Sequence, residues 1–455
     1  MDLVVLIVVG LRLRDLAHAP GLRALGARGS VAPLQTVFPA VTCSVQASFL
    51  TGLAPSGHGA VGNGWYFRDQ AQVWLWRQAN QLVQGEKVYE TAKRQDPGFT
   101  AAKLFWWWNM YARVDWSLTP RPEYWANGLK RPGLYSHPGD LQREVQQRLG
   151  PFPLFHFWGP TADILSTRWI VDSALDVMTR RSPRLTLVYL PHLDYDHQRF
   201  GPDDPRSVLA VRAVDAEAMR LCDAALARGS RVLVLSEYGI EAATHPVFVN
   251  KILHEAGLLA VQETGHGDLL DAGASRAFAV ADHQCAHVYV RESEDLGRVA
   301  KLLGSVPGVA RVLERAAQRE LRIDHERSGE LVLVAEKGAW FAYHYWLEES
   351  RRPDFATTVD IHRKPGYDPT ELFVDPKLRF PKLRVARRLA QKLLGFRYLM
   401  DVIGTDPSIV KGTHGRIFAD PLDGPVVLSS ERGLRADAIS ALAIKDTILD
   451  LLQLG

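Results

Sequence analysis

Four short apolar runs, rich in β-branched residues, constrain the fold of this chain more than any other feature. They read VVLIVV, LTLVYL, RVLVLS and AHVYV, and they begin at residues 4, 185, 231 and 286. None alternates strictly between apolar and polar residues, which is typical of strands buried on both faces of a parallel sheet. Helical patterns separate them, for example over 167–181 and 208–229. This alternation predicts an α/β fold with a doubly wound, mostly parallel central sheet.

The remaining chain predicts lobes inserted around this core. Residues 65–150 are rich in tryptophan and proline, whereas residues 291–400 begin like a small α/β unit and continue into a Pro- and Arg-rich stretch. We interpret both as insertions at the carboxyl-terminal edge of the sheet, where they would cover a site. The predicted division is core over 1–64, aromatic-rich insertion over 65–150, core over 151–290, cap over 291–400, and a core return with a closing amphipathic helix over 401–455.

Composition adds expectations about the environment of the protein. A net charge of +3 over 455 residues gives no reason to expect specific nucleic-acid binding. Three widely spaced cysteines form neither a disulfide framework nor a zinc motif, which favours a reducing compartment and a cytoplasmic protein. The apolar start of the chain is followed by arginines and is interpreted as a buried strand rather than a signal peptide. No apolar run reaches the roughly 20 residues of a transmembrane helix.

Polar side chains able to bind a metal ion follow two of the predicted strands. Asp194, His197 and Gln198 come after LTLVYL, and Glu237 comes after RVLVLS. Ligands of open α/β sheets bind beyond the carboxyl ends of the strands. A single acidic residue in a loop is more often simply solvated, but carboxylates at two strand exits predict a site.

A third segment places a hydroxyl at the start of a helix. TCSVQASFLTG is typical of a helix that begins at Thr42 and stops at Gly52. The N-terminus of a helix offers free N–H groups and the positive end of the helix dipole, so it favours phosphate. Thr42 is therefore either an ordinary cap or a nucleophile beside a phosphoryl site.

The same segment carries a family resemblance. Residues 38–63 contain, in this order, FPAVT, SFLTG and PSGHGAVGN. This order resembles the nucleophile segment of nucleotide pyrophosphatases/phosphodiesterases and phosphonoacetate hydrolases, within the alkaline phosphatase superfamily. The resemblance implies that Thr42 attacks phosphorus and that Asn63 hydrogen-bonds a phosphoryl oxygen. It also implies two metal ions, usually zinc, while His58 ties the loop.

The positions that hold the first ion in this family are partly retained. Asp194 and the late His414 match the family pattern. Four residues after Asp194 stands Gln198 instead of a histidine, with His197 one place earlier, so either side chain is a candidate for the third ligand.

The positions that hold the second ion depart further. Val9 replaces an aspartate, and Glu237–Tyr238 replaces an Asp–His pair. A neutral phenol is a poor metal ligand because its pKa lies near 10. Three outcomes stay open: a single ion, a harder ion such as Mn²⁺ or Mg²⁺ in place of zinc, or ligands recruited from elsewhere.

The candidates for recruitment lie in VDIHRKPGYDP. Asp360 and His362 are two residues apart and would face the same way on an extended segment, although such a pair more often forms a hydrogen-bonded loop. Arg363 and Lys364 follow and would suit an anionic substrate. A second group of possible ligands is interpreted as having structural roles: Asp282, His283 and His287.

Two further stretches have both a structural and a functional interpretation. The run Trp106–Trp108 is typical of core packing, and Trp107 is the candidate to stack on a flat group of a substrate. The basic run over 377–397 predicts a cationic amphipathic helix. The basic face of this helix is either simply solvated, or it contacts a polyphosphate, an anionic membrane surface or a partner protein.

These observations lead to one main hypothesis and two alternatives. The main hypothesis is a metal-dependent hydrolase of a small phosphorylated substrate, a phosphodiester or pyrophosphate, that works through a phosphothreonine intermediate. The first alternative is a degenerate relative that binds a phosphorylated metabolite without hydrolysis, because several ligand positions have changed. The second is a phosphoryl transferase on the same scaffold.

Overall fold

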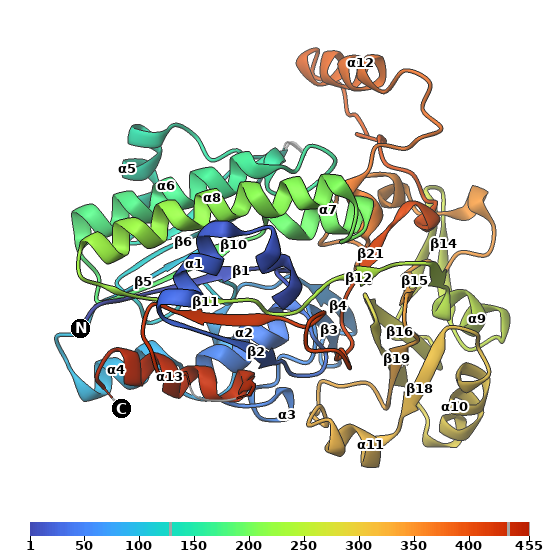
Figure 1. Cartoon of the computed structure of the whole chain (residues 1–455). Coiled ribbons are helices and arrows are strands. Elements are labelled where there is room, and N and C mark those ends of the chain that lie inside the picture. Colours follow the sequence, from blue (N-terminus) through green and yellow to red (C-terminus); the bar gives the residue numbers. More distant parts are fainter. Residues whose placement is uncertain (127–129, 435–436, 455) are drawn as a thin grey trace.

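The computed structural model describes residues 1–126, 130–434 and 437–454. Within them, the largest sheet has nine strands in the order β23-β2-β22-β11-β1-β10-β5-β6-β9 (Figure 1). Five strands at its centre are parallel to one another: β11 (Arg231–Leu235), β1 (Leu3–Val8), β10 (Leu185–Leu190), β5 (Ala101–Leu104) and β6 (Trp116–Pro120). The predicted α/β fold with a mostly parallel central sheet is confirmed.

Antiparallel pairs flank this parallel centre. On one side β22 pairs antiparallel with β11 and β2, and β23 pairs parallel with the outer edge of β2, whereas on the other side β9 pairs antiparallel with β6. The bounds of these strands are β22 (Val426–Ser429), β2 (Ser30–Gln35), β23 (Ile439–Ser440) and β9 (Leu134–His137).

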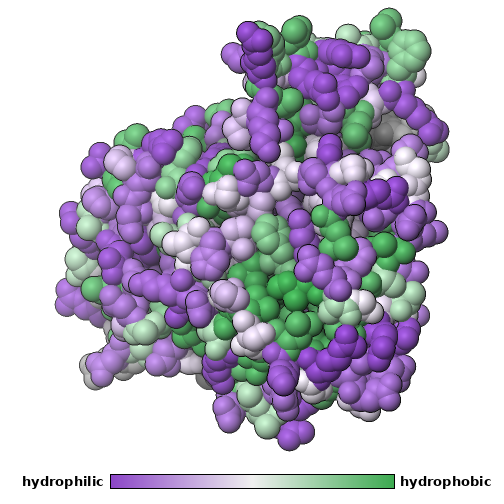
Figure 2. Space-filling model, turned by 90° about the vertical axis from the view of Figure 1, so that its right-hand side faces the viewer, coloured by the Kyte–Doolittle hydropathy of each residue, from purple (hydrophilic) through white to green (hydrophobic). Residues whose placement is uncertain are grey.

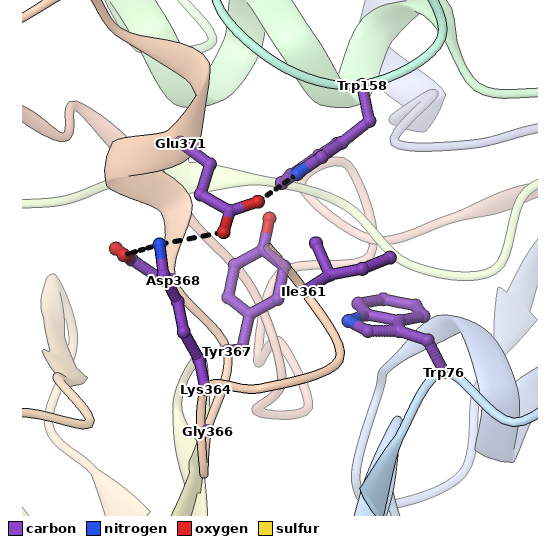
Figure 3. Close-up of a pocket in the computed structure, with 8 residues that line it drawn as sticks. All are labelled: Trp76, Trp158, Ile361, Lys364, Gly366, Tyr367, Asp368 and Glu371. Carbon is purple, nitrogen blue, oxygen red and sulfur yellow. Dashed lines mark hydrogen bonds and ion pairs between the residues drawn. The ribbon is translucent and has the colours of Figure 1, made fainter. Parts of the chain in front are cut away.

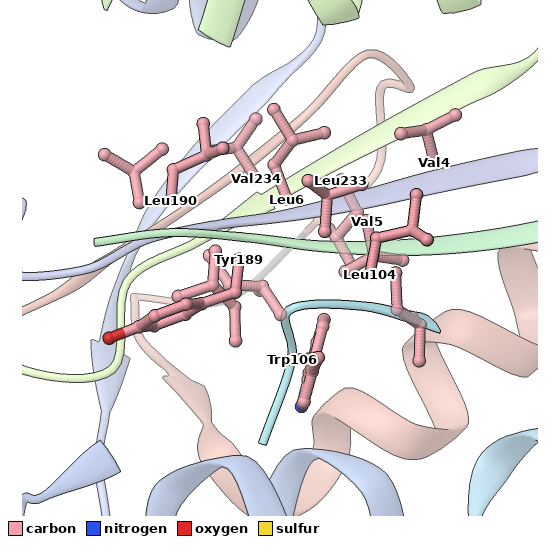
Figure 4. Close-up of a cluster of buried hydrophobic side chains, with 14 of the residues drawn as sticks. Val4, Val5, Leu6, Leu104, Trp106, Tyr189, Leu190, Leu233 and Val234 are labelled. Atoms are coloured by element: carbon pink, nitrogen blue, oxygen red, sulfur yellow. The ribbon is translucent and has the colours of Figure 1, made fainter. Parts of the chain in front are cut away.

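Helices cover both faces of the sheet, so the side chains of its strands are buried above and below (Figure 1). One face carries α1 (Pro20–Arg28), α6 (Ile164–Arg181) and α8 (Pro205–Ala227), and the other carries α2 (Thr42–Thr51), α4 (Val88–Gln95) and α13 (Ile444–Leu451). Leu6, Leu190 and Val234 point to one face, whereas Tyr189 and Trp106 lie on the other (Figure 4). Burial on both faces is why these strands do not alternate.

A second lobe has its own antiparallel sheet, with the strand order β16-β17-β19-β18. Helices α9 (Val249–Glu255), α10 (Leu296–Gly304) and α11 (Arg315–Glu320) accompany it beside the central sheet (Figure 1). The strands are β16 (Ala277–Asp282), β17 (Cys285–Val290), β19 (Leu331–Ala335) and β18 (Val309–Leu313).

The run AHVYV belongs to this second sheet, so its prediction as a strand of the central sheet is wrong. Both faces of β17 are covered: Ala286 and Val288 pack into the core of the lobe, whereas Cys285 packs against the loop that follows α2. A buried antiparallel strand therefore shows the same apolar pattern as a parallel one.

The aromatic-rich segment 65–150 also differs from the prediction of a separate insertion. It supplies β5, β6 and β9 to the central sheet. These short strands are hidden in the sequence because β5 reads AAKL and β6 begins with a tryptophan. Over the described residues, the structure contains no helix that is both long enough and apolar enough to cross a bilayer.

Candidate active site

The carboxyl ends of adjacent parallel strands meet the N-terminus of α2. Helix α2 begins at Thr42 and ends before Gly52, whose φ of 72° suits a glycine stop, as predicted. The Thr42 hydroxyl lies 3.0 Å from the hydroxyl of Tyr238, which follows β11. Thr42 is only 4% exposed. The predicted nucleophile therefore stands at the first turn of a buried helix, with its oxygen paired to a phenol.

Asn63 is tied between this helix and the second lobe. Its Oδ1 accepts the backbone N–H of Cys43 at 3.0 Å, and its Nδ2 donates to Asp282 Oδ1 at 3.0 Å. The backbone N–H of Asn63 donates to the other carboxylate oxygen of Asp282 at 2.7 Å. Asp282 ends β16, next to the turn of the β16–β17 hairpin, so the lobe fixes the Asn63 side chain beside Thr42.

Asp194 and His414 face each other with atoms that lack hydrogen bonds. Asp194 lies in the first turn of α7 (His192–Phe200), which follows β10, and its Oδ1 is 3.9 Å from His414 Nε2. In the part of the chain that the structure describes, neither atom has a hydrogen-bond partner. His414 Nδ1 donates to the carbonyl of Ala40 at 2.8 Å, which leaves the lone pair on Nε2.

Burial controls the charge of these groups. It raises the pKa of Asp194 to about 7, although Gln198 and Tyr238 partly offset the shift. Burial also lowers the pKa of His414 to about 3, so this ring is neutral. The pKa of Glu237 is well above its usual range, again because of burial, although Gln46 Nε2 donates to its Oε1 at 2.6 Å. A cation near these carboxyls would favour their ionised forms.

His197 and Gln198 have different surroundings although they are adjacent. Gln198 Oε1 accepts a hydrogen bond from Tyr367 at 3.0 Å, so the oxygen that a metal would need is in use. The pKa of His197 is lowered to about 4, chiefly by burial, and the charges that act on it belong to Asp15, Arg12 and Asp203. His197 therefore belongs to a neighbourhood other than that of Asp194.

Tyr238, which stands at a position predicted for the second ion, belongs to a stack of four rings. Tyr238 stacks on His414 with centroids 3.6 Å apart and planes 6° apart, and His283 lies 3.6 Å beyond His414. Tyr367 continues the stack, 3.8 Å from His283. Val9, at the aspartate position, is fully buried. Val9 offers no donor atom, and Glu237, which was predicted as a metal ligand, keeps one buried oxygen, Oε2, without a hydrogen-bond partner in the described structure.

The facing pair Asp194 and His414 is the part of the site that fits a divalent cation. Among the described residues, no group of three or more His, Cys, Asp and Glu side chains is placed to hold a metal. The pair Asp194 and His414 supplies one carboxylate and one imidazole, both with an unpartnered atom. Their separation of 3.9 Å is below the sum of two metal–ligand distances of about 2 Å each. Water or substrate would complete the coordination.

The segment after β20 (Ala339–Phe341) does not supply the recruited metal site that the sequence predicted. Asp360 Oδ2 is 3.2 Å from Arg363 Nε, and the backbone N–H of Asp360 donates to Glu371. Neither Asp360 nor His362 enters a three-residue cluster within the described chain. Arg363 is thus paired inside its own loop.

Lys364 is buried, which contradicts its prediction as a contact for an anionic substrate. Its Nζ lies 2.7 Å from both Asp368 and Glu371. The three side chains line a pocket with Trp76, Trp158 and Tyr367, and Glu371 also accepts a hydrogen bond from Trp158 (Figure 3). The ammonium group of Lys364 forms ion pairs with both carboxylates and is not available to a substrate. A Lys–Pro–Gly sequence is typical of an exposed turn, but here all three residues are buried.

The tryptophan run divides between two cores. Trp106 packs against the central sheet, whereas Trp107 and Trp108 pack beside the loop after α2. Trp107 is 8% exposed, and its ring N–H donates to the carbonyl of Arg77. Core packing accounts for all three rings, and Trp107 remains near the site because its backbone N–H donates to Gln46.

The sequence did not point to Gln46 as a residue of the site, and it predicted only a structural role for His283, which stacks on His414. Gln46 joins Glu237 to the backbone of Trp107 through hydrogen bonds of 2.6 Å each. Its position four residues after Thr42 was the available signal, because side chains four apart share one helix face. His283 carried no such signal, since it reaches His414 only through the hairpin of the other lobe. His58 bonds Ser48 and the backbone of Ala60, in line with its predicted structural role.

The carboxyl of Asp282 predicts a pH-dependent contribution to stability. Burial raises its pKa to about 6, so the folded chain binds this proton more tightly than the unfolded chain. This contribution is complete below about pH 4 and is lost as the pH rises through about 6. Between pH 4 and pH 8, wild type should therefore lose about 3 kcal/mol of its free energy of unfolding relative to Asp282→Asn, which has no proton to lose at this position. Urea titrations at both pH values measure it, and a constant difference would contradict it.

Comparison with known proteins agrees with this geometry. The family model described as type I phosphodiesterase/nucleotide pyrophosphatase matches residues 3–368. An uncharacterized pyrophosphatase/phosphodiesterase of Schizosaccharomyces pombe is 22% identical over 282 residues, which span 60% of this chain and about half the length of that relative.

Two solved structures share the fold over nearly the whole chain. Phosphonoacetate hydrolase from Sinorhizobium meliloti has a TM-score of 0.62 at 13% identity, covering 99% of this chain and 95% of its own. Murine ectonucleotide pyrophosphatase/phosphodiesterase 5 has a TM-score of 0.60 at 14% identity, covering 100% and 96%. At such identities the structural likeness shows the fold alone, whereas the family model spans most of the sequence. The chain therefore belongs to the type I phosphodiesterase/nucleotide pyrophosphatase family.

Proposed function

We propose that this protein hydrolyses phosphate esters, either phosphodiesters or pyrophosphates, with Thr42 as the nucleophile. One observation carries the proposal: the Thr42 hydroxyl stands at the first turn of α2, paired with Tyr238 and next to Asn63. A helix N-terminus binds phosphoryl oxygens through its free N–H groups and its dipole. A phosphoryl group bound at the N-terminus of α2 would thus lie next to the Thr42 hydroxyl.

The reaction would proceed in two displacements. In the first, a bond forms between Thr42 Oγ1 and phosphorus and the bond to the leaving oxygen breaks, while the Thr42 proton is released to solvent and the leaving oxygen takes up a proton from solvent. In the second, water attacks phosphorus, the P–Oγ1 bond breaks and Thr42 regains its proton. With a diester substrate, the phosphothreonine still carries the second alcohol. Asn63 and the helix N–H groups would hold the non-reacting oxygens.

A divalent cation is the cofactor that the family implies. Asp194 and His414 would hold it, and when bound it would neutralise charge that develops on the phosphoryl oxygens. Oxygen and nitrogen donors of this kind suit zinc as well as Mn²⁺.

Solved proteins of the same fold hold phosphorus-containing ligands. One structure of the murine relative, described as inactive with a threonine replaced by alanine, holds AMP. Phosphonoacetate hydrolase was solved with phosphonoacetate and with phosphonoformate. The shared chemistry is a phosphorus centre with anionic oxygens, which is the class of substrate that we propose.

Trapping the covalent intermediate tests the proposal. The protein is mixed with a p-nitrophenyl phosphodiester in the presence of Zn²⁺ or Mn²⁺, quenched in acid, and analysed by intact-mass and peptide mass spectrometry. We expect an adduct on the peptide that contains Thr42, together with released p-nitrophenol. Turnover without an adduct at any time point, or an adduct elsewhere, would contradict the mechanism. An added alcohol that captures the phosphoryl group would indicate a transferase.

The stacked rings favour a second candidate, a binder without turnover. Tyr238 occupies the position of a metal-binding histidine and engages the Thr42 hydroxyl at 3.0 Å. Calorimetric titration with AMP and with the p-nitrophenyl diester separates the two functions. Binding without release of p-nitrophenol under any of the metal conditions would favour the binder.

Metal content is expected to be no more than one ion per chain. After dialysis against Zn²⁺ and gel filtration, elemental analysis of wild type should find about one equivalent, because Asp194 and His414 face each other with unpartnered atoms, whereas Glu237 offers only its Oε2 and its other oxygen accepts from Gln46. Asp194→Asn should lose this ion. Asp196→Asn is the matched control, since Asp196 sits on the same helix but pairs with Arg199 at 3.1 Å. Two equivalents in wild type would refute the one-ion interpretation.

A further inference from the structure

Helix α12 (Pro381–Leu393) stands apart from both sheets. It lies at the top of Figure 1, joined to the second lobe by the chain on either side. None of its residues is buried. An isolated helix of this length is marginal in water, so a helix without packed neighbours calls for another source of stability.

The helix turns its charged face inward and its apolar face outward. Arg384 and Arg388 both donate to the carboxylate of Asp401, the latter at 2.9 Å and 3.0 Å. The other sides of the helix carry exposed leucines together with Lys382 and Arg387. Leu393 is 87% exposed and Leu394 is 73% exposed. Further exposed apolar side chains of this face and its flanks are Phe380, Leu383, Leu389 and Phe396.

The charge of the segment has a single sign. Residues 376–400 contain eight lysine and arginine residues and no aspartate or glutamate. Two of these cations share the single carboxylate of Asp401, and exposed Lys382 and Arg387 stand beside the apolar row. At the upper end of Figure 2, where this helix lies, hydrophobic and strongly hydrophilic atoms adjoin on the surface.

Exposed leucine and phenylalanine bordered by basic side chains have the composition of a helix that lies in a lipid interface. Such helices place their apolar face among the acyl chains, while lysine and arginine extend to anionic headgroups. A cytosolic protein groove would also cover the apolar row, but it would have to offer acidic groups along the whole segment. An anionic bilayer provides both features in one surface.

We propose that α12 and its flanks, residues 377–397, bind the surface of an anionic lipid bilayer. The apolar row Leu383, Leu393, Leu394 and Phe396 enters the interface, while Lys382 and Arg387 contact phosphate headgroups. The ion pairs with Asp401 keep the apolar row facing outward. This surface is separate from the Thr42 site, so its failure and that of the proposed function are independent.

Vesicle binding by the full chain tests the surface. Flotation compares vesicles of phosphatidylcholine alone with vesicles that contain about one third phosphatidylglycerol. Wild type should bind the anionic vesicles at least about tenfold more strongly. Leu393→Glu/Phe396→Glu and Lys382→Glu/Arg387→Glu should each lower that binding about tenfold. Leu209→Glu, at an exposed leucine of α8, is the matched control and should bind like wild type.

Insertion has a separate readout. The native cysteines Cys43, Cys222 and Cys285 are buried, so Leu394→Cys offers the accessible thiol for an environment-sensitive fluorophore. Its emission should shift to the blue with anionic vesicles and stay unchanged with neutral ones. No vesicle binding, or equal binding to both compositions, would overturn the proposal. So would a dimer in light scattering that Leu393→Glu/Phe396→Glu abolishes, because a second copy would then be the occupant.

Discussion

Thr42→Ala is expected to lose at least about 1000-fold in turnover of p-nitrophenyl phosphodiesters, because it removes the nucleophile itself. The variant should still fold. It loses one hydrogen bond, the 3.0 Å contact with Tyr238, which contributes about 1 kcal/mol. Affinity for a non-hydrolysable analogue should change little, since Asn63 and the helix N–H groups remain. A loss in kcat with an unchanged dissociation constant is therefore the expected signature.

Two controls make this result specific. Ser44→Ala removes a buried hydroxyl that has no hydrogen-bond partner in the described structure and lies two residues further along the same helix, so its turnover should match wild type. Thr42→Ser keeps a nucleophilic oxygen and should keep measurable turnover, with an adduct on the same peptide. Full turnover in Thr42→Ala would remove the residue from the mechanism and leave the hydrolase without a nucleophile.

Lys364→Met is expected to lower the free energy of unfolding by about 3–5 kcal/mol, because it leaves the carboxylates of Asp368 and Glu371 buried without their cation. Lys364 is 1% exposed, so water cannot replace it. The loss should appear as a lower urea midpoint with an unchanged slope. A loss near zero would mean that both carboxylates are protonated in the folded protein.

The matched variant neutralises all three groups. Lys364→Met/Asp368→Asn/Glu371→Gln removes the unpaired charges and should recover most of the lost stability, because apolar or neutral replacements of a buried ion cluster are often well tolerated. Lys337→Met, at an exposed lysine, is the control and should change the free energy of unfolding by less than about 0.5 kcal/mol.

Local patterns predicted the parts of this structure that depend on neighbours in the sequence. Helix α2 could be bounded from a threonine at its start and a glycine at its end, and both bounds agree with the structure. The strands β1, β10 and β11 could be found because each is a continuous apolar run, whereas β5 and β6 are not. β17 could not be assigned to its sheet, since an apolar run reports burial on both faces and not the identity of the neighbouring strand.

The contacts of the site that depend on tertiary structure were beyond the sequence. Tyr238 stood out as a departure from the family pattern, but its stack on His414 requires a loop far along the chain. Lys364 sits in a turn-forming sequence, and only the placement of Asp368 and Glu371 explains why it is buried. The outward apolar face of α12 was equally hidden, because the sequence shows amphipathicity without showing which side meets solvent.

The hydrogen bond from His414 to the carbonyl of Ala40 joins two residues that are 374 positions apart. On the ribosome, the helix that carries Thr42 emerges long before the histidine that completes its surroundings. Polypeptides cut short before residue 414 would lack the imidazole that faces Asp194 and the last strands of the central sheet, β22 and β23. The proposed site is thus assembled only when nearly the whole chain has been synthesised, and proteolytic loss of the last tenth of the protein would dismantle it while leaving Thr42 in the chain.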